Sequence, residues 1–581
     1  MNDLRKDLIS AFQAGKFLET VYEKTLSEHG SGHDDLTDEL VRMHNNGLLD
    51  VIAGFKSLRN KSDAGYNFFT IRRVLEKALP KLNSPVQQVM ECVLHLVSEA
   101  GQDMAAGALF DSFINFCADE PSRPKESLKQ IEASSDKLAD LLIPTIIAGA
   151  RIDNNHYLNE AIRLTAHEKI EVRKRAVSSL GRIQYPKDTN LCEIALACLE
   201  LSATKETDDQ LLGNLIRSAF SLYQQDKSLE ERVINLINRA LPSDGESALH
   251  AASELFGTNF NELPEALLDV LLNHLRSVRP QNKGTLNNID YGLVNLIKLE
   301  DPTKGIEFLE ALLRANPNDV QMDIFDSVIL ELYKNSTLLN KLLTRWFLRG
   351  DRVFCEGIHA IVNKIHDHDM LLKIDPSELV SVDMVHIVFL ARKAIGYLFF
   401  KPVSAASVVV SLMHHTNDDE TLQQLDTLIF DPLLLNFPGK VRDFLIQQAK
   451  SESGKAKTTI EAALKRFEEY IDDFKSTGTI PELHPSQAQR DAYRRHFSRL
   501  MQESFKEAEK KSVFASLFSK SVLLYGRKSI NYVYGPDGKS NRMEIPLQSY
   551  GTQIEFPQYQ TIDPFGLDYM LRIFRVEKLK T

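Results

Sequence analysis

The strongest constraint on the fold of this chain lies in residues 171–183, where apolar side chains recur with the period of an α-helix. Residues three and four positions apart share one face of a helix, so these side chains form a single stripe. The spacings are four, four and three, at Val172, Ala176, Leu180 and Ile183. Because Ala176 and Gly181 are small, the pattern predicts that a neighbouring helix approaches this one closely, or that the helix stops at the glycine.

A second apolar pattern comes just before this helix, and residues 167–169 form a short polar turn between the two. Its apolar side is formed by Leu158, Ile162 and Leu164. Residues 158–183 resemble the HEAT/armadillo family of helical repeats, including the Val-Arg pair of that family, here Val172-Arg173. The resemblance implies an α-solenoid of stacked helix pairs that binds other macromolecules, and it implies no reaction.

Helical periodicity recurs from residue 1 to about 475, and proline, glycine or polar residues interrupt it between segments long enough for three to six turns. Helix pairs are expected to begin near residues 156, 187, 228, 262, 302 and 335, a spacing typical of helix-pair repeats. We therefore predict a mostly α fold, an α-solenoid of stacked helix pairs. The expected divisions are an N-terminal helical region (1–150), a HEAT-like array (151–475) and a C-terminal α+β module (476–581).

The predicted C-terminal module begins with a helix from Ser486 to about residue 511. Alternating residues at 529–534 and 543–547 flank a glycine-containing turn and predict a β-hairpin. Pro546 cannot donate to a ladder, so we expect the second strand at an edge or a bulge. A last helix is expected from Phe565 to about residue 575.

The net charge also differs between the helical array and the C-terminal part of the chain. Residues 440–581 contain 24 Lys/Arg and 18 Asp/Glu, whereas the whole chain has a net charge of −11. The first helix of the module is two-sided, and we expect its apolar face, which includes Tyr493 and Phe497, to be buried in the core. The opposite face and the first strand supply the candidate partner- or nucleic-acid-binding residues, which are Arg495, Arg499, Lys506, Lys510, Arg527, Lys528 and Tyr532. The alternative is a solvated helix face that pairs with acidic groups of the same chain.

Two other motifs have simpler structural explanations. Residues 535–540 end like a phosphate-binding loop, but they lie between two expected strands and lack the first glycine, so they predict a hairpin turn. His366 and His368 are weak metal-ligand candidates, since neighbouring residues on a helix point about 100° apart and do not converge. We expect a polar helix end there, and neither a metal nor a cofactor.

Composition places the chain among folded proteins, with 43% hydrophobic and 26% charged residues. Five cysteines without a Cys-x-x-Cys pair argue against a disulfide framework and favour a reducing compartment. The apolar window 385–400 carries His386, Arg392 and Lys393, so we expect a helix buried in protein and no membrane span. A cytoplasmic location is expected.

These patterns favour a non-enzymatic scaffold or adaptor that binds protein partners along a helical-repeat surface. The alternative is a nucleic-acid-binding subunit of a larger machine that acts through its basic C-terminal module. An enzyme is the weakest hypothesis, because no set of catalytic residues converges in the sequence. The oligomeric state does not follow from the sequence.

Overall fold

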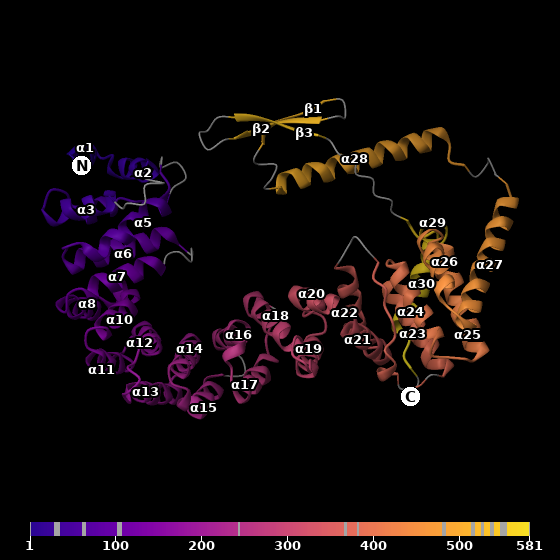
Figure 1. Cartoon of the computed structure of the whole chain (residues 1–581), viewed down its shortest axis with the longest axis horizontal. Helices are drawn as coiled ribbons and strands as arrows, with labels where there is room; N and C mark the ends of the chain where they lie inside the picture. Colours follow the sequence, from indigo (N-terminus) through magenta and orange to yellow (C-terminus); the bar gives the residue numbers. More distant parts are fainter. Residues whose placement is uncertain are drawn as a thin grey trace. The chain divides into compact units, whose positions relative to one another are not determined.

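The protein is mostly α-helical with one small antiparallel sheet, which confirms the predicted fold class (Figure 1). The structure is a computed structural model. It describes residues 2–27, 35–60, 66–101, 107–241, 245–279, 281–364, 369–379, 381, 383–478, 484–512, 518–524, 528–534, 540–546 and 555–579.

The chain divides into two compact units, residues 1–334 and residues 335–581. This division falls inside the array expected at 151–475, and residues 1–150 belong to the same unit as the repeats that follow them. Contacts of α7 (Gly107–Ala118) with α10 (Leu142–Ala150), and of α10 with α12 (Ile170–Arg182), join the two parts. The helices before the repeats are α1 (Asn2–Gln13), α2 (Phe17–Ser27), α3 (Asp35–Asn45), α4 (Val51–Phe55), α5 (Phe68–Ala78), α6 (Val86–Ala100), α7 (Gly107–Ala118), α8 (Ser122–Ala133), α9 (Ser135–Leu138) and α10 (Leu142–Ala150).

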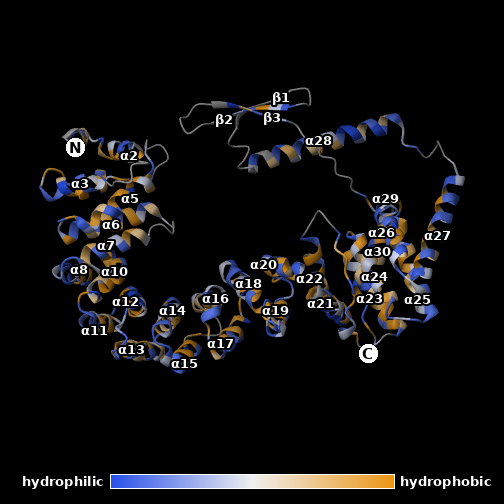
Figure 2. Ribbon diagram, viewed as in Figure 1, coloured by the Kyte–Doolittle hydropathy of each residue, from blue (hydrophilic) through white to orange (hydrophobic). Residues whose placement is uncertain are grey.

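Two layers of helices build the rest of the first unit. Each even-numbered helix packs on the next even-numbered one, and the odd-numbered helices from α11 to α17 do the same. Hydrophobic residues lie where the helices face one another (Figure 2). The even layer consists of α12 (Ile170–Arg182), α14 (Asp209–Gln225), α16 (Glu246–Thr258), α18 (Lys283–Ile297) and α20 (Asp326–Lys334). The odd-numbered helices are α11 (Asn154–Leu164), α13 (Leu191–Lys205), α15 (Glu230–Ala240), α17 (Glu265–Leu275) and α19 (Thr303–Ala315).

The expected starts of the helix pairs are confirmed. Starts near 156, 187, 228, 262, 302 and 335 fall within four residues of the first residues of α11, α13, α15, α17, α19 and, in the second unit, α21 (Ser336–Arg349). The stripe predicted in residues 171–183 is also buried, with Ala176, Leu180 and Ile183 fully inaccessible. The repeat period was therefore readable from the turn residues between the helices.

Small residues let neighbouring even helices approach closely. A Cβ on Gly181 of α12 would lie 2.5 Å from the Cα of Ser218 on α14. On Gly257 of α16 it would lie 2.6 Å from the carbonyl oxygen of Asn288 on α18. The hydroxyl of Ser218 also donates to the carbonyl of Val177 over 2.9 Å. The prediction that Gly181 permits close packing is confirmed.

Carboxylates fix the register between even helices. Asp209 on α14 accepts from the backbone N–H groups of Ser247 and Ala248 at the start of α16, over 2.7 and 3.1 Å. The buried Asp290 on α18 accepts in the same way at the start of α20, over 2.9 Å for both N–H groups. A carboxylate at a helix N-terminus satisfies otherwise unpaired donors and complements the helix dipole. Each cap therefore ties one even helix to the beginning of the next.

In the second unit, the apolar window of the sequence forms helix α23 (Met384–Leu398), and other helices pack around it. Leu390, Ala394 and Ile395 of this helix are fully buried, as expected for a helix inside protein. No helix among the described residues is both long and apolar enough to span a membrane. The helices after α21 are α22 (Arg352–Asn363), α23 (Met384–Leu398), α24 (Pro402–Met413), α25 (Asp419–Leu428), α26 (Lys440–Ser451) and α27 (Gly454–Ser476).

The end of the chain is built into this second unit. The predicted last helix is α30 (Pro564–Val576), which follows the single turn α29 (Tyr559–Ile562). It packs on α23, where Gly396 leaves room for Phe574. Arg575 donates to the carbonyl of Gly396 over 2.6 Å. The buried Lys393 in turn donates to the carbonyl of Arg575 over 2.6 Å, which satisfies a carbonyl in the last turn of α30. Residues 564–576 are thus held by α23, outside any separate C-terminal module.

The predicted long helix is α28 (Gln487–Lys511), and Ser486 caps it as expected. The Ser486 hydroxyl accepts from the backbone N–H of Gln489, whose side chain accepts from the N–H of Ser486. The sheet has three antiparallel strands, β1 (Phe518–Leu524), β2 (Lys528–Tyr534) and β3 (Ser540–Pro546), with β2 in the centre. The hairpin and the edge position of Pro546 are confirmed, and the sequence interpretation missed β1.

The close contact at Gly181 predicts that any larger residue at this position lowers the stability of the folded protein. Changing Gly181→Ala should destabilise the protein by about 1–2 kcal/mol, because overpacking outweighs the gain in helix propensity. The urea midpoint of unfolding measures it. The control is Gly284→Ala in α18, where the nearest atom to a new Cβ is 3.5 Å away and stability should stay equal or rise. An equal or higher midpoint for the Gly181 variant would contradict the packing argument.

Candidate functional site

The candidate functional site is a groove of about 570 Å³ that crosses four successive even helices of the first unit. The N-terminal halves of α12, α14 and α16, the first residues of α18 and the two residues before it contribute the lining. Within this set, Asp209 ties α14 to the start of α16. We call this surface the even-layer groove. Its lining residues are Glu171, Lys174, Arg175, Gln210, Asn214, Arg217, Glu246, Ser247, His250, Gln281, Asn282, Lys283, Gly284 and Thr285.

Lys174 organises the α12 end of the groove. Its side chain is only 9% exposed and its ammonium group lies 3.0 Å from Glu171 and 3.3 Å from Asp208. It also donates to the side-chain carbonyl of Gln210 over 2.8 Å. These partners compensate the charge of a nearly buried lysine, and they hold α12 and α14 together at the floor of the groove.

Compensated charges continue on α14 and α16. Arg217 lies 2.6 Å from Glu254, which also accepts from His250 when that ring is protonated, over 3.2 Å. The other ring nitrogen of His250 lies 3.1 Å from the hydroxyl of Thr285 on α18. Together with the Lys174 cluster, this leaves a polar surface with little uncompensated charge.

Chemically, the even-layer groove offers hydrogen bonds over an extended length. Helices pack about 8–10 Å apart, so four of them span about 27 Å, which matches about eight residues of an extended chain. A peptide backbone both donates and accepts, and the amide side chains of the groove can serve it. The Nε2 of Gln210 can donate and the Oδ1 of Asn214 can accept, because the other amide atom of each already bonds to Lys174. Glu246 and Lys283 are exposed and present charge of both signs along the groove.

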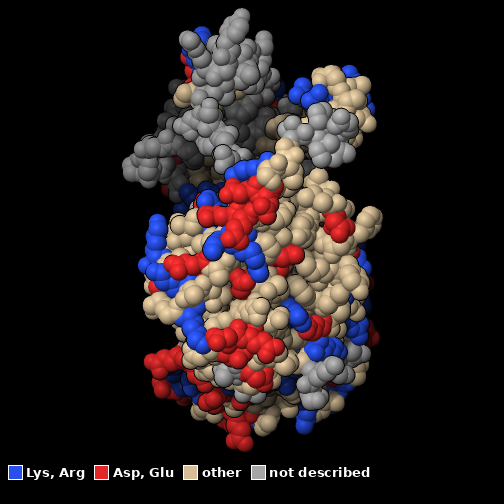
Figure 3. Space-filling model, turned by 90° about the vertical axis from the view of Figure 1, so that its right-hand side faces the viewer, with Lys and Arg blue, Asp and Glu red and all other residues tan. Residues whose placement is uncertain are grey.

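The four helical members of the predicted basic stripe lie on α28 and all of them are exposed: Arg495, Arg499, Lys506 and Lys510. At about 100° per residue they fall within about 60° of one helix face, so they form one row. Lys528 and Tyr532 lie on β2, and both side chains are partly buried. Lys528 is 2.5 Å from Glu544 on β3, which compensates its charge. Arg527 lies outside the described residues. On the face of the molecule in Figure 3, acidic and basic side chains are interspersed.

The expectation that the apolar face of α28 is buried is wrong. Tyr493 is 70% exposed, Phe497 53% and Phe505 67%. The face of α28 that carries these aromatic residues also includes the polar Arg494 and Ser504. The helix is therefore less clearly divided into an apolar and a polar side than its aromatic residues suggested. Hydrophilic positions are spread along the whole of α28 (Figure 2).

The weak metal candidates His366 and His368 lie outside the described residues. In the parts of the chain that the structure describes, no three histidine, cysteine or acidic side chains are grouped as metal ligands. His359 donates from its Nδ1–H to the carbonyl of Tyr397 over 2.6 Å. The five cysteines are free thiols, and burial raises the pKa of Cys92 and Cys355 to about 12. Both therefore stay protonated and weakly nucleophilic.

The sequence interpretation missed the even-layer groove, although a signal for it exists. Glu171, Gln210, Ser247 and Gly284 are the second residues of α12, α14, α16 and α18, and they are separated by 39, 37 and 37 positions. A polar or small residue at the start of every even helix marks a surface that the helices share. That signal becomes visible only after the repeats have been aligned with one another.

Comparison with known proteins adds no assignment to this geometry. No protein-family model and no curated protein matches the chain.

Proposed function

We propose that the protein is a non-enzymatic scaffold that binds a protein partner along the even-layer groove. The observation that carries this proposal is a polar groove that runs across four repeats and is lined by residues at equivalent positions. An extended segment of a partner fits its length, and the amide side chains supply partners for the backbone of that segment. The HEAT/armadillo resemblance of residues 158–183 supports the same conclusion.

The mechanism would be recognition by shape and hydrogen bonding, with charge as a secondary contribution. Because the charges on the floor are already paired, they impose little desolvation cost on a polar segment. The exposed Glu246 and Lys283 would then set the direction in which a charged partner lies. No cofactor takes part in such a mechanism.

A second function is supported by the basic row on α28. Four exposed cations on one helix face could contact four phosphates of a nucleic acid, and aromatic residues elsewhere on α28 are exposed for base stacking. This surface is independent of the even-layer groove, so each function can be tested without the other.

The scaffold proposal predicts a charge-swapped variant that loses its partner. Glu246→Arg combined with Lys283→Glu keeps the net charge but reverses both exposed charges of the groove. Affinity capture from the native cell, followed by binding of the purified partner, should show at least about a tenfold loss of affinity. The matched control swaps the exposed loop residues, Lys187→Glu with Asp188→Lys, and should bind like the unaltered protein. A partner that both variants hold equally, or no retained protein at all, would contradict the proposal.

The nucleic-acid alternative predicts a steep salt dependence. With four phosphates neutralised, log K against log salt should have a slope of about −3.6 for duplex DNA and about −2.8 for a single strand. Fluorescence anisotropy measures it. Arg495→Glu with Arg499→Glu should abolish binding, whereas Arg490→Glu with Arg494→Glu changes the same charge on the other side of α28 and should weaken binding less. Absence of binding at low salt removes this function.

A further inference from the structure

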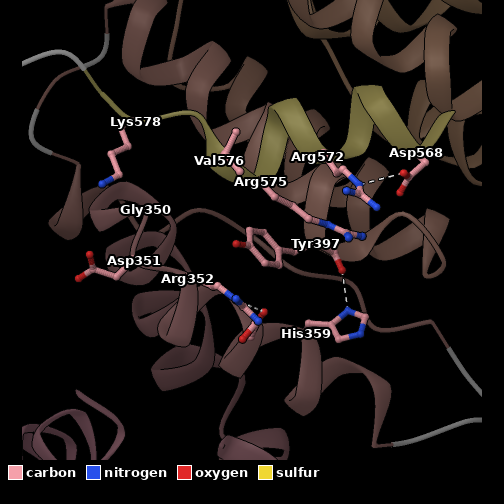
Figure 4. Close-up of a pocket in the computed structure, with 11 residues that line it drawn as sticks. Gly350, Asp351, Arg352, His359, Tyr397, Asp568, Arg572, Arg575, Val576 and Lys578 are labelled. Carbon is pink, nitrogen blue, oxygen red and sulfur yellow. Dashed lines mark hydrogen bonds and ion pairs between the residues drawn. The ribbon is translucent and has the colours of Figure 1, made fainter. Parts of the chain in front are cut away.

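A second cavity, of about 840 Å³, opens within the second unit between α22 and α30 (Figure 4). Its volume lies in the range of small-molecule sites. Arg352, Glu356 and His359 line it from α22, and Tyr397 lines it from α23. The other wall comes from the end of the chain, with Asp568, Arg572, Arg575, Val576 and Lys578. We call it the α22–α30 pocket.

Three arginines of this pocket are each held through the same atom, Nε. Arg352 donates from Nε to Glu356 over 2.7 Å, and the Nε of Arg572 lies 2.8 Å from Asp568. Arg575 donates from Nε to the carbonyl of Gly396 over 2.6 Å. A guanidinium has five N–H donors, so this arrangement fixes each group while its two terminal nitrogens remain for another acceptor.

Charge in the pocket favours an anion. Lys578 adds a fourth cation, against the three carboxylates of Asp351, Glu356 and Asp568. Asp351 occupies the N-cap position of α22, but its side chain makes no capping hydrogen bond with the first turn. The backbone N–H groups at the start of this 12-residue helix therefore add partial positive charge at the same place.

Two polar residues of the pocket are already engaged and do not compete for a ligand. One ring nitrogen of His359 contacts the carbonyl of Tyr397 and the other lies 2.7 Å from the side-chain nitrogen of Asn363. Burial raises the pKa of the Tyr397 phenol, which stays neutral. The Tyr397 ring, over which the Arg575 guanidinium lies at 5.8 Å, and the exposed Val576 give the pocket an apolar part.

We propose that the α22–α30 pocket binds a small organic phosphate monoester, a function beyond the proposed scaffold role. The terminal nitrogens of Arg572 and Arg575 would contact the phosphate oxygens, since four terminal nitrogens suit a group with three equivalent oxygens better than a carboxylate with two. Arg352 would add positive charge from the opposite wall of the pocket. The organic part would lie toward Tyr397 and Val576. Figure 4 shows Arg572 and Arg575 extending from the same side of α30 into the pocket.

Calorimetric titration of the full chain with phenyl phosphate tests this proposal. One molecule should bind per chain with a Kd on the order of 0.1–1 mM at pH 8, and inorganic phosphate should bind more weakly because it lacks the ring. The second pKa of a phosphate monoester is about 6, so affinity should fall about tenfold from pH 8 to pH 5 as the dianion is lost.

Arg352→Gln with Arg572→Gln should weaken binding of phenyl phosphate at least about tenfold. Both side chains are largely exposed, 78% and 72%, so the variant should fold. The control, Arg442→Gln with Lys465→Gln, removes the same charge outside the pocket and should bind normally. No saturable binding at millimolar concentrations, or equal losses in both variants, would overturn the proposal and leave the scaffold function untouched.

Discussion

The close approach of neighbouring even helices is the interaction on which the first unit depends. Gly181 against Ser218, and Gly257 against Asn288, bring the backbones of successive helices nearly into contact. At that distance the Ser218 hydroxyl reaches the carbonyl of Val177 on the preceding helix. A side chain at either glycine would push the helices apart, and the hydrogen bonds between them would be lost with the contact. Packing and polar contacts therefore support one another.

The same proximity explains how the even-layer groove forms. Asp209 reaches the N-terminus of α16, and Asp290 reaches that of α20, only because the even helices lie close together. Within the groove, the Asp209 cap joins α14 to α16, and Lys174 joins α12 to α14 through Asp208. His250 reaches Thr285 at the start of α18, so the polar residues of the four helices form one continuous surface. The groove is a direct consequence of how the repeats stack. The proposed binding function thus follows from the packing of the array.

Much of the array could be predicted from the sequence, because turn residues and the apolar period are local signals. The starts of the helix pairs and the burial of Ala176 and Leu180 belong to this class. The attachment of α30 to α23 could not be predicted in this way. It depends on Lys393 and Gly396, which precede Arg575 by 182 and 179 residues and share no sequence pattern with it. The α22–α30 pocket exists only because of that attachment.

Two further differences between the sequence-based prediction and the structure have local causes. Strand β1 was missed because Val522, Leu523 and Leu524 form a continuous apolar run without the alternation that marks a half-exposed strand. The apolar side of α28 was expected in a core because its aromatic residues share a face, yet periodicity alone does not supply a surface to cover it. For the candidate sites, sequence reasoning identified the basic row of α28 and missed both cavities, since a cavity is formed by several elements at once.

Amide hydrogen exchange of the full chain tests most directly whether the even layer holds the first unit together. Ten of the 17 residues of α14 are buried, compared with five of the 15 residues of α13. Slow exchange requires a costly local opening, so amides of α12, α14, α16 and α18 should exchange more slowly than those of α11, α13, α15 and α17. Equal protection in both layers, or faster exchange in the even helices, would contradict the account.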